Sequence, residues 1–365
     1  MKTQISAYQL FATMLLFAYG SASLFFLTPD AKQDAWLTIL LYIPVGIILQ
    51  FLYTELFYQY PDDTLITYLP KIFGRLLGYP LSVIYILYFT YIAARVLRDF
   101  SELILMATMP ELSLLLVASV FMTAFAYGAF AGIENISRAA QITLPIILFI
   151  FFLIMIALYA TPEVVKFRNL KPVLENGIVS VMKAGLLLAT FPYGEPVTFS
   201  MIYRSVNEPD KVRKTAVLAI ISLGAILSMN TIMIIVTLGI NFATTSQFPL
   251  YESMRLIKLG GIFDKLDILI IVMLSIVGSM KVCVFTYAAM LGTTQLMKWN
   301  DPKYLAIPFG IGILILSILI APNYPEHIRI GLKWTPVYIH LPLIIIVPSL
   351  ALIVHYIKKA LRSLN

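Results

Sequence analysis

The stretch Thr190-Phe191-Pro192-Tyr193-Gly194-Glu195-Pro196 interrupts an apolar run that extends from about residue 178 to residue 203. Each proline removes a backbone amide donor from a helix, and the glycine loosens the backbone. In hydrocarbon, free amides and carbonyls are tolerated only where protein or a wet cavity satisfies them. We therefore expect a broken membrane helix here, with the break beside an internal site near the middle of the membrane.

The composition predicts an all-α polytopic membrane protein. Of the 365 residues, 60% are hydrophobic and only 12% are charged, as suits a bundle whose helices each need about 20 apolar residues. The net charge of +7 lies mainly in short connections between apolar runs, where basic residues orient helices, and we exclude nucleic acid as a partner. The single Cys283 allows no internal disulfide.

Apolar runs of spanning length predict about ten transmembrane helices. They lie at about 8–27, 36–58, 80–107, 112–132, 138–160, 178–203, 216–241, 267–297, 304–321 and 336–356. Ten spans place both termini on one side, and the excess of Lys and Arg favours the cytoplasm. No linker is long enough for a second domain. We expect one membrane domain, 1–365, built from five-helix repeats at 1–160 and 161–365.

The first span carries a weaker interruption, Tyr19-Gly20-Ser21-Ala22-Ser23. Because each half has an odd number of spans, the second half is inverted relative to the first, and spans one and six correspond. Paired broken helices in inverted halves are typical of transporters that hold substrate between the unwound segments. The alternative is two unrelated kinks in packed helices.

The third span carries four charges on one helical face: Arg95, Arg98, Asp99 and Glu102. Each would cost about 2.5–3.5 kcal/mol at mid-membrane, so the charges must be paired or hydrated. Arg95 stands four residues before Asp99, and Arg98 four before Glu102, which permits pairing within the helix. A structural ion-pair network and a role in ligand or ion handling both remain open. We expect the face to line a polar vestibule in the outer half of the span.

Lys281 in the eighth span is too central to reach the membrane surface and needs a partner. The candidates are Glu195 and the carboxylates of the third span, and the alternative is a lysine that replaces a proton or cation. The segment 248–258, which ends at Gly260–Gly261, predicts an amphipathic lid or connector on the membrane surface.

Enzyme chemistry is not indicated. No catalytic triad, phosphate-binding glycine loop or pair of catalytic carboxylates stands out. His327, His340 and His355 lie at the ends of the last two spans without the spacing of metal ligands. We expect no metal and no cofactor.

Five segments in the expected order resemble the B subunits of bacterial endospore germinant receptors of the GerAB/GerKB type. They are Ile5–Leu10 (ISAYQL), Ala31–Trp36 (AKQDAW), Ala94–Glu102 (ARVLRDFSE), Asn169–Gly177 (NLKPVLENG) and Gly261–Asp267 (GIFDKLD). The resemblance implies a member of the amino acid, polyamine and organocation transporter superfamily with a LeuT-like core. It also implies the spore inner membrane, an A-type membrane subunit, a C-type lipoprotein subunit, and a role in sensing an amino acid, a sugar or a nucleoside.

A small nutrient is expected between the breaks of spans one and six, flanked by spans three and eight. Amides at Gly20 to Ala22 would meet an anionic group if a helix restarts there. Glu195 would meet an ammonium or hydroxyls, unless it satisfies the positive end of its own helix. The predicted ligand-binding set is Tyr19, Gly20, Ser21, Ala22, Tyr91, Phe191, Tyr193, Gly194, Glu195 and Tyr287. The alternatives to a receptor are a secondary transporter of amino acids or cations, and ion conduction in an assembly.

Overall fold

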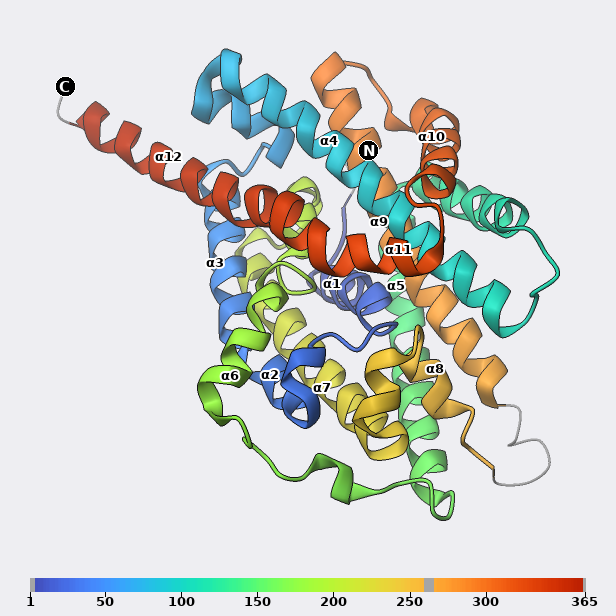
Figure 1. Cartoon of the computed structure of the whole chain (residues 1–365). Helices are drawn as coiled ribbons and strands as arrows, with labels where there is room; N and C mark the ends of the chain where they lie inside the picture. Colours follow the sequence, from blue (N-terminus) through green and yellow to red (C-terminus); the bar gives the residue numbers. More distant parts are fainter. Residues whose placement is uncertain (1–3, 259–265, 364–365) are drawn as a thin grey trace.

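The computed structural model describes residues 4–258 and 266–363. Within them the regular elements are helices, and Ile5 and Val206 add one isolated parallel bridge (Figure 1). The α-helices are α1 (Ala7–Ala22), α2 (Ala35–Leu41), α3 (Ile43–Gln59), α4 (Leu65–Ala107), α5 (Leu114–Ala160), α6 (Gly177–Ala184), α7 (Val212–Thr245), α8 (Pro249–Met254), α9 (Leu266–Met297), α10 (Ala306–Leu319), α11 (Tyr324–Arg329) and α12 (Val347–Ser363). The all-α prediction is confirmed.

Seven helical stretches among the described residues are long and apolar enough to cross a membrane. The longest, α5, has 47 residues and would reach about 70 Å if straight, more than twice the hydrocarbon thickness. It changes direction at Gly132, whose φ of +85° suits glycine, and the predicted spans 112–132 and 138–160 fall on either side. The short α1 and the interrupted sixth span complete the predicted set.

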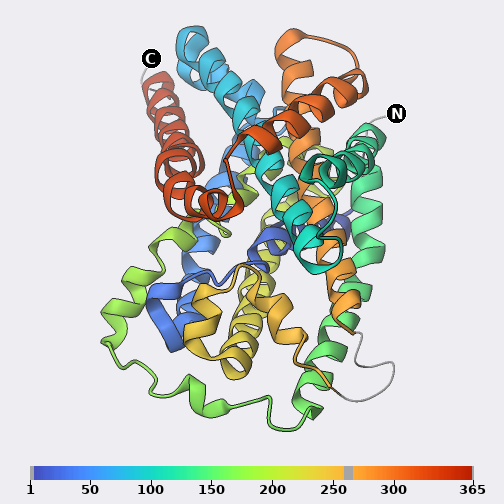
Figure 2. The same cartoon turned by 45° about the vertical axis from the view of Figure 1, so that its right-hand side comes forward.

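Helix α1 forms the centre of the bundle. Every residue from Ala12 to Ala22 is buried, as expected for a helix surrounded by others. It packs against α5, α7 and α9, and both views show it enclosed (Figures 1 and 2). The element that carries the first predicted interruption therefore lies inside the protein.

The sixth span is broken as predicted. It runs through α6 and a 3-10 turn at Leu186–Ala189, loses helical structure near Pro192, and resumes as 3-10 segments at Glu195–Met201 and Tyr203–Ser205. Tyr193 and Glu195 are buried. The break lies inside the bundle.

The first span is also interrupted, but later than expected. Helix α1 continues through Gly20 to Ala22, and no helical element follows until Pro29. A Cβ on Gly20 would lie 3.1 Å from the carbonyl oxygen of Val277, so this glycine permits close packing against α9. The expected helix restart at Gly20 to Ala22 is wrong, because these residues form the last turn of α1, where amides bond to carbonyls one turn earlier.

Two further expectations concern segment 248–258 and its neighbourhood. Only Pro249–Met254 is helical there, as α8, and Leu250 and Met254 are buried. Helix α8 packs its apolar side chains against α7 and α9, so the helix is shorter than expected, and its position as a lid or connector on the membrane surface stays a prediction. The expected end at Gly260–Gly261 and nearly all of the segment 261–267 lie outside the described residues.

The last span begins earlier than the sequence suggested. Helix α11 continues through two π-helical segments, Ile330–Trp334 and Pro336–Ile346, into α12. The predicted span, 336–356, omitted the first turns. These turns carry His327 and Thr335 into the interior, and π-helical turns often occur at functional sites.

Candidate functional site

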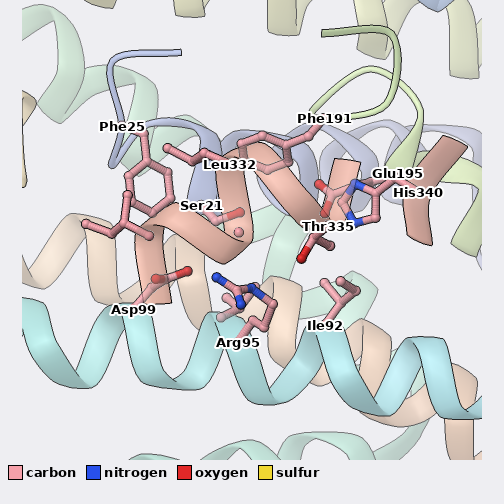
Figure 3. A pocket seen from close by; sticks show the side chains of 13 residues that line it. Ser21, Phe25, Ile92, Arg95, Asp99, Phe191, Glu195, Leu332, Thr335 and His340 are labelled. Carbon is pink, nitrogen blue, oxygen red and sulfur yellow. The ribbon is translucent and has the colours of Figure 1, made fainter. Parts of the chain in front are cut away.

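A small polar cavity lies where the broken sixth span meets α1, α4 and the start of the last span (Figure 3). It offers about 40 Å³ to the centre of a water-sized sphere, room for about three waters. The lining residues are Ser21, Phe25, Ile92, Arg95, Val96, Asp99, Phe191, Glu195, Ile328, Gly331, Leu332, Thr335 and His340. Both predicted breaks therefore contribute to one cavity wall.

A buried ion pair joins three elements beside this cavity. The Lys281 Nζ lies 2.5 Å from Glu195 Oε2 and donates a 2.7 Å hydrogen bond to Ser21 Oγ. The ammonium also lies 5.0 Å and 5.3 Å from the ring centroids of Phe191 and Phe17, where the faces of aromatic rings attract a cation. Of the two candidate partners, Glu195 is the one that pairs with Lys281, and the pair ties α9 to both interrupted spans.

Glu195 does not cap its own helix. The 3-10 segment that it begins has no side-chain cap, and the hydrogen-bond partner of its carboxylate among the described residues is Lys281. Glu195 stands in the first turn of this segment, so the alternative in which its charge satisfies the positive end of the helix stays open beside its ion pair with Lys281.

Arg95 and Asp99 both point from α4 into the cavity (Figure 3), but they do not form the ion pair that their spacing permits. Arg95 donates to the carbonyl oxygen of His327 at 2.5 Å and to the Tyr91 hydroxyl at 3.4 Å. Asp99 accepts from Tyr324 at 3.4 Å and lies 3.0 Å from His327 Nε2. The pairing that the spacing of Arg95 and Asp99 permitted does not form, because α11 lies over this face of α4 and supplies partners to both side chains.

Arg98 and Glu102 form the second predicted pair, at 3.3 Å, and this pairing is confirmed. Arg98 also donates to the carbonyl oxygens of Ala321 at 2.6 Å and Ile318 at 3.3 Å. These carbonyls follow and end α10, where free carbonyls need donors and the helix dipole favours a cation. Arg98 therefore holds α10 against α4, outside the cavity.

Three of the ten predicted ligand-binding residues line the cavity: Ser21, Phe191 and Glu195. Others make internal contacts elsewhere. Asn230 donates to the Tyr19 hydroxyl at 2.9 Å, the Tyr193 hydroxyl donates to Ile39 at 2.8 Å, and Tyr53 donates to the carbonyl of Gly194 at 3.1 Å. The Tyr91 hydroxyl lies 3.0 Å from the hydroxyl of Thr335, which lines the cavity, so Tyr91 is one residue removed from the cavity wall. Gly20, Ala22 and Tyr287 are buried off the cavity wall.

Comparison with known proteins gives the family. A family model described as "Spore germination protein" matches residues 4–325. The chain belongs to the spore germination protein family. It is 36% identical to spore germination protein KB of Bacillus subtilis (strain 168), over 99% of this chain and 97% of that protein. It is also 24% identical to spore germination protein YndE of the same strain, over 82% of this chain and 81% of that protein.

Solved structures give this spore germination protein its fold class. MhsT in complex with L-phenylalanine matches 98% of this chain and 99% of its own, with a TM-score of 0.66 and 14% identity. A Na+-coupled sialic acid symporter in a substrate-bound outward-open state matches 92% of this chain and 80% of its own, with a TM-score of 0.63 and 12% identity. These are LeuT-fold transporters, so the predicted LeuT-like architecture is confirmed. The family match and the seven apolar helical stretches among the described residues make the chain an integral membrane protein of receptor or permease type.

His340 is the main residue of the site that sequence reasoning missed. Its side chain is buried, and neither ring nitrogen has a hydrogen-bond partner within the part of the chain that the structure describes. It lines the cavity, and its ring meets Tyr88 edge to face at 5.7 Å. The signal was a histidine inside the apolar run Ile339–Leu341, since ionisable residues in membrane helices usually face an internal site.

Proposed function

We propose that this chain is the nutrient-sensing transmembrane subunit of a spore germinant receptor. A small nutrient, either an amino acid, a sugar or a nucleoside, binds in the cavity between the interrupted spans. An A-type membrane subunit and a C-type lipoprotein subunit then carry the signal. The receptor lies in the spore inner membrane with the termini of this chain in the cytoplasm. The observation that carries the proposal is the Glu195–Lys281–Ser21 contact, which joins both interrupted spans beside an internal cavity.

The cavity wall can recognise a polar ligand. Arg95 offers guanidinium donors, Asp99 and Glu195 offer carboxylate acceptors, and His340 offers a donor and an acceptor that have no partner in the described residues. The side chains of Phe25 and Phe191 supply apolar surface on the same wall. This combination suits a compact ligand that carries several hydrogen-bonding groups.

Binding requires the wall to move. The space holds about three waters, less than an amino acid or a sugar occupies. A nutrient that bonds to Glu195 or displaces Lys281 would loosen the ties between α9 and the two interrupted spans. It would therefore favour a wider arrangement, provided that its affinity differs between the two arrangements. We assign the two halves, 1–160 and 161–365, as the bodies that move.

The experiment is a germination assay with spores in which Glu195→Gln replaces the native residue. Loss of the carboxylate should abolish the fall in optical density that the triggering nutrient causes. Because the substitution also leaves the buried Lys281 ammonium unpaired, the response is normalised to the amount of protein that immunoblots show in the membrane fraction. Glu134→Gln is the matched control, because Glu134 makes an exposed ion pair with Arg138 on α5. An unchanged response of the Glu195 variant would remove this residue from the site.

A secondary transporter of amino acids or cations is the second candidate, and the likeness to transporter structures favours it. Purified chain in liposomes, supplied with labelled nutrient and a proton or Na⁺ gradient, separates the two functions. Saturable binding without uptake supports the receptor. Accumulation of label above equilibrium supports the transporter.

A further inference from the structure

A second cavity with basic side chains on its wall lies at the other end of α4 from the residues that line the nutrient site. It is lined by Ile66, Thr67, Pro70, Lys71, Arg75, Tyr79, Gln295, Leu296 and Lys298 and has a volume of about 300 Å³. Its walls come from the two arms of α4 and from the end of α9. Nothing in the proposed nutrient mechanism uses it.

The turn of α4 builds this cavity. At Gly74 the backbone takes a φ of +79°, which glycine adopts without strain. The short part of α4 before Gly74 therefore folds back on the long part after it. Ser82 Oγ donates to the carbonyl of Ile66 at 2.9 Å, and a side chain on Gly78 would collide with the backbone of Pro70. The fold therefore fixes the positions of Lys71 and Arg75 beside the end of α9.

The cavity carries an excess of positive charge. Lys71 pairs with Asp63 at 2.5 Å. Arg75 and Lys298 are exposed and have no carboxylate within 4.0 Å among residues 4–258 and 266–363. Gln295 accepts a 2.6 Å hydrogen bond from Thr64, which leaves its amide donors for another partner. The charged groups of the wall without a carboxylate partner, Arg75 and Lys298, are both cations, so the complementary ligand is an anion.

The surroundings place this cavity at a membrane interface. Leu76 and Leu77 follow Arg75 directly and are 87% and 60% exposed, as suits contact with acyl chains. Three exposed aromatic side chains lie in the adjoining segments, namely Tyr79, Trp299 and Tyr304. Tyrosine and tryptophan concentrate where headgroups meet hydrocarbon. Basic pockets between membrane helices at this depth bind anionic headgroups.

We propose that this cavity binds an anionic phospholipid. The phosphodiester headgroup lies between Arg75 and Lys298, with Gln295 as a hydrogen-bond donor, and the acyl chains lie along Leu76 and Leu77. The same end of α4 is tied to the last helix, because Lys358 Nζ donates to the carbonyl of Ile72 at 2.7 Å. A bound lipid would therefore brace the junction of α4, α9 and α12.

The test is native mass spectrometry of the full chain released from nanodiscs that contain equal amounts of phosphatidylglycerol and phosphatidylcholine with the same acyl chains. Two basic side chains at an anionic surface correspond to about a 30-fold preference for the anionic lipid. Arg75→Gln with Lys298→Gln should reduce that preference to near unity. Arg168→Gln with Lys171→Gln is the matched control, since both residues are exposed in the loop at the opposite end of the molecule (Figure 1).

Two further measurements use only the native protein, so they test the proposal even if a variant fails to fold. Raising the salt concentration should weaken retention of phosphatidylglycerol. Inorganic phosphate should displace it no better than chloride at equal ionic strength. Equal retention of the two lipids, equal loss in the control variant, or specific displacement by phosphate would each overturn the assignment. Because the readout is bound lipid, it is independent of any response to nutrient.

Discussion

Two buried charged regions of this molecule have similar compositions and opposite uses. Around Arg98, the guanidinium bonds to Glu102 on its own helix and to backbone carbonyls at the end of α10. Around Lys281, the ammonium bonds to side chains on two other elements, Glu195 and Ser21, beside a cavity. Backbone carbonyls cannot leave without unfolding a helix end, whereas side-chain partners can exchange for a ligand. The partners therefore distinguish Arg98, which supports a helix end, from Lys281, which holds the two interrupted spans beside the cavity.

The largest effect is expected for Lys281→Met. Removing one member of a buried ion pair leaves the other charge uncompensated and costs about 3–5 kcal/mol of stability. We expect little protein in the membrane and no germination response. Combining Lys281→Met with Glu195→Gln removes both charges and should restore the amount of protein without restoring the response. Restored germination in the double variant would show that the pair is structural, like Arg98.

The next effect is expected for Arg98→Met. It removes donors from the end of α10 and should destabilise the protein by about 1–3 kcal/mol, measured as a lower Tm in detergent. The nutrient concentration for half-maximal germination should not change in spores that contain equal amounts of receptor. Arg138→Met, on the exposed face of α5, is the control for loss of a guanidinium. A shifted half-maximal concentration would place Arg98 in the nutrient site and end the distinction drawn above.

An effect of similar size, on the nutrient response and not on stability, is expected for Arg95→Gln, because Arg95 faces the cavity and does not join the two interrupted spans. A charge-assisted hydrogen bond contributes about 1.5–3 kcal/mol, so the half-maximal nutrient concentration should rise about 10- to 150-fold. Arg95→Lys keeps the charge, so its half-maximal nutrient concentration should lie between those of the native protein and Arg95→Gln. Identical dose–response curves for all three proteins would exclude Arg95 from ligand binding.

The smallest effect is expected for Glu208→Gln in the loop before α7. Glu208 accepts from the amide of Ala7 at 3.5 Å, and its ion pair with Lys211 holds its pKa below the usual range. A lowered pKa contributes stability at neutral pH that is lost as the pH falls through the folded-state value, but the pair is exposed and screened. The Tm should be unchanged at pH 7. A clear loss of Tm or of germination there would show that the loop belongs to the signalling machinery.

The sequence predicted the sixth-span break because proline and glycine act locally on the backbone. It also limited the partner of Lys281 to Glu195 or the carboxylates of the third span, because a central ammonium in a membrane has few acceptable partners. Gly20 was misread: glycine marks either a break or a close approach of two helices, and only the position of α9 distinguishes them.

The partners of Arg95 and Asp99 could not be predicted from the third span. The spacing of four residues does place Arg95 and Asp99 on one face of α4. Their partners, His327 and Tyr324, lie more than two hundred residues away in the sequence. They belong to a helix whose first turns were not assigned to the last span. His340 was placed near the end of that span for the same reason. Local patterns therefore located the helices, while packing between helices selected which charges face the cavity.

The most direct measurement is protection of a reporter thiol at the nutrient site. Ser21→Cys in a Cys283→Ala background places one thiol on the cavity wall, since the native sequence has a single cysteine. The rate of its reaction with a small methanethiosulfonate reagent is measured in membranes with and without the nutrient that triggers germination. We predict at least a severalfold slower reaction with the nutrient present, and no protection by a nutrient that does not trigger germination. Equal rates, in a variant that still responds to the nutrient, would contradict a binding site between the interrupted spans.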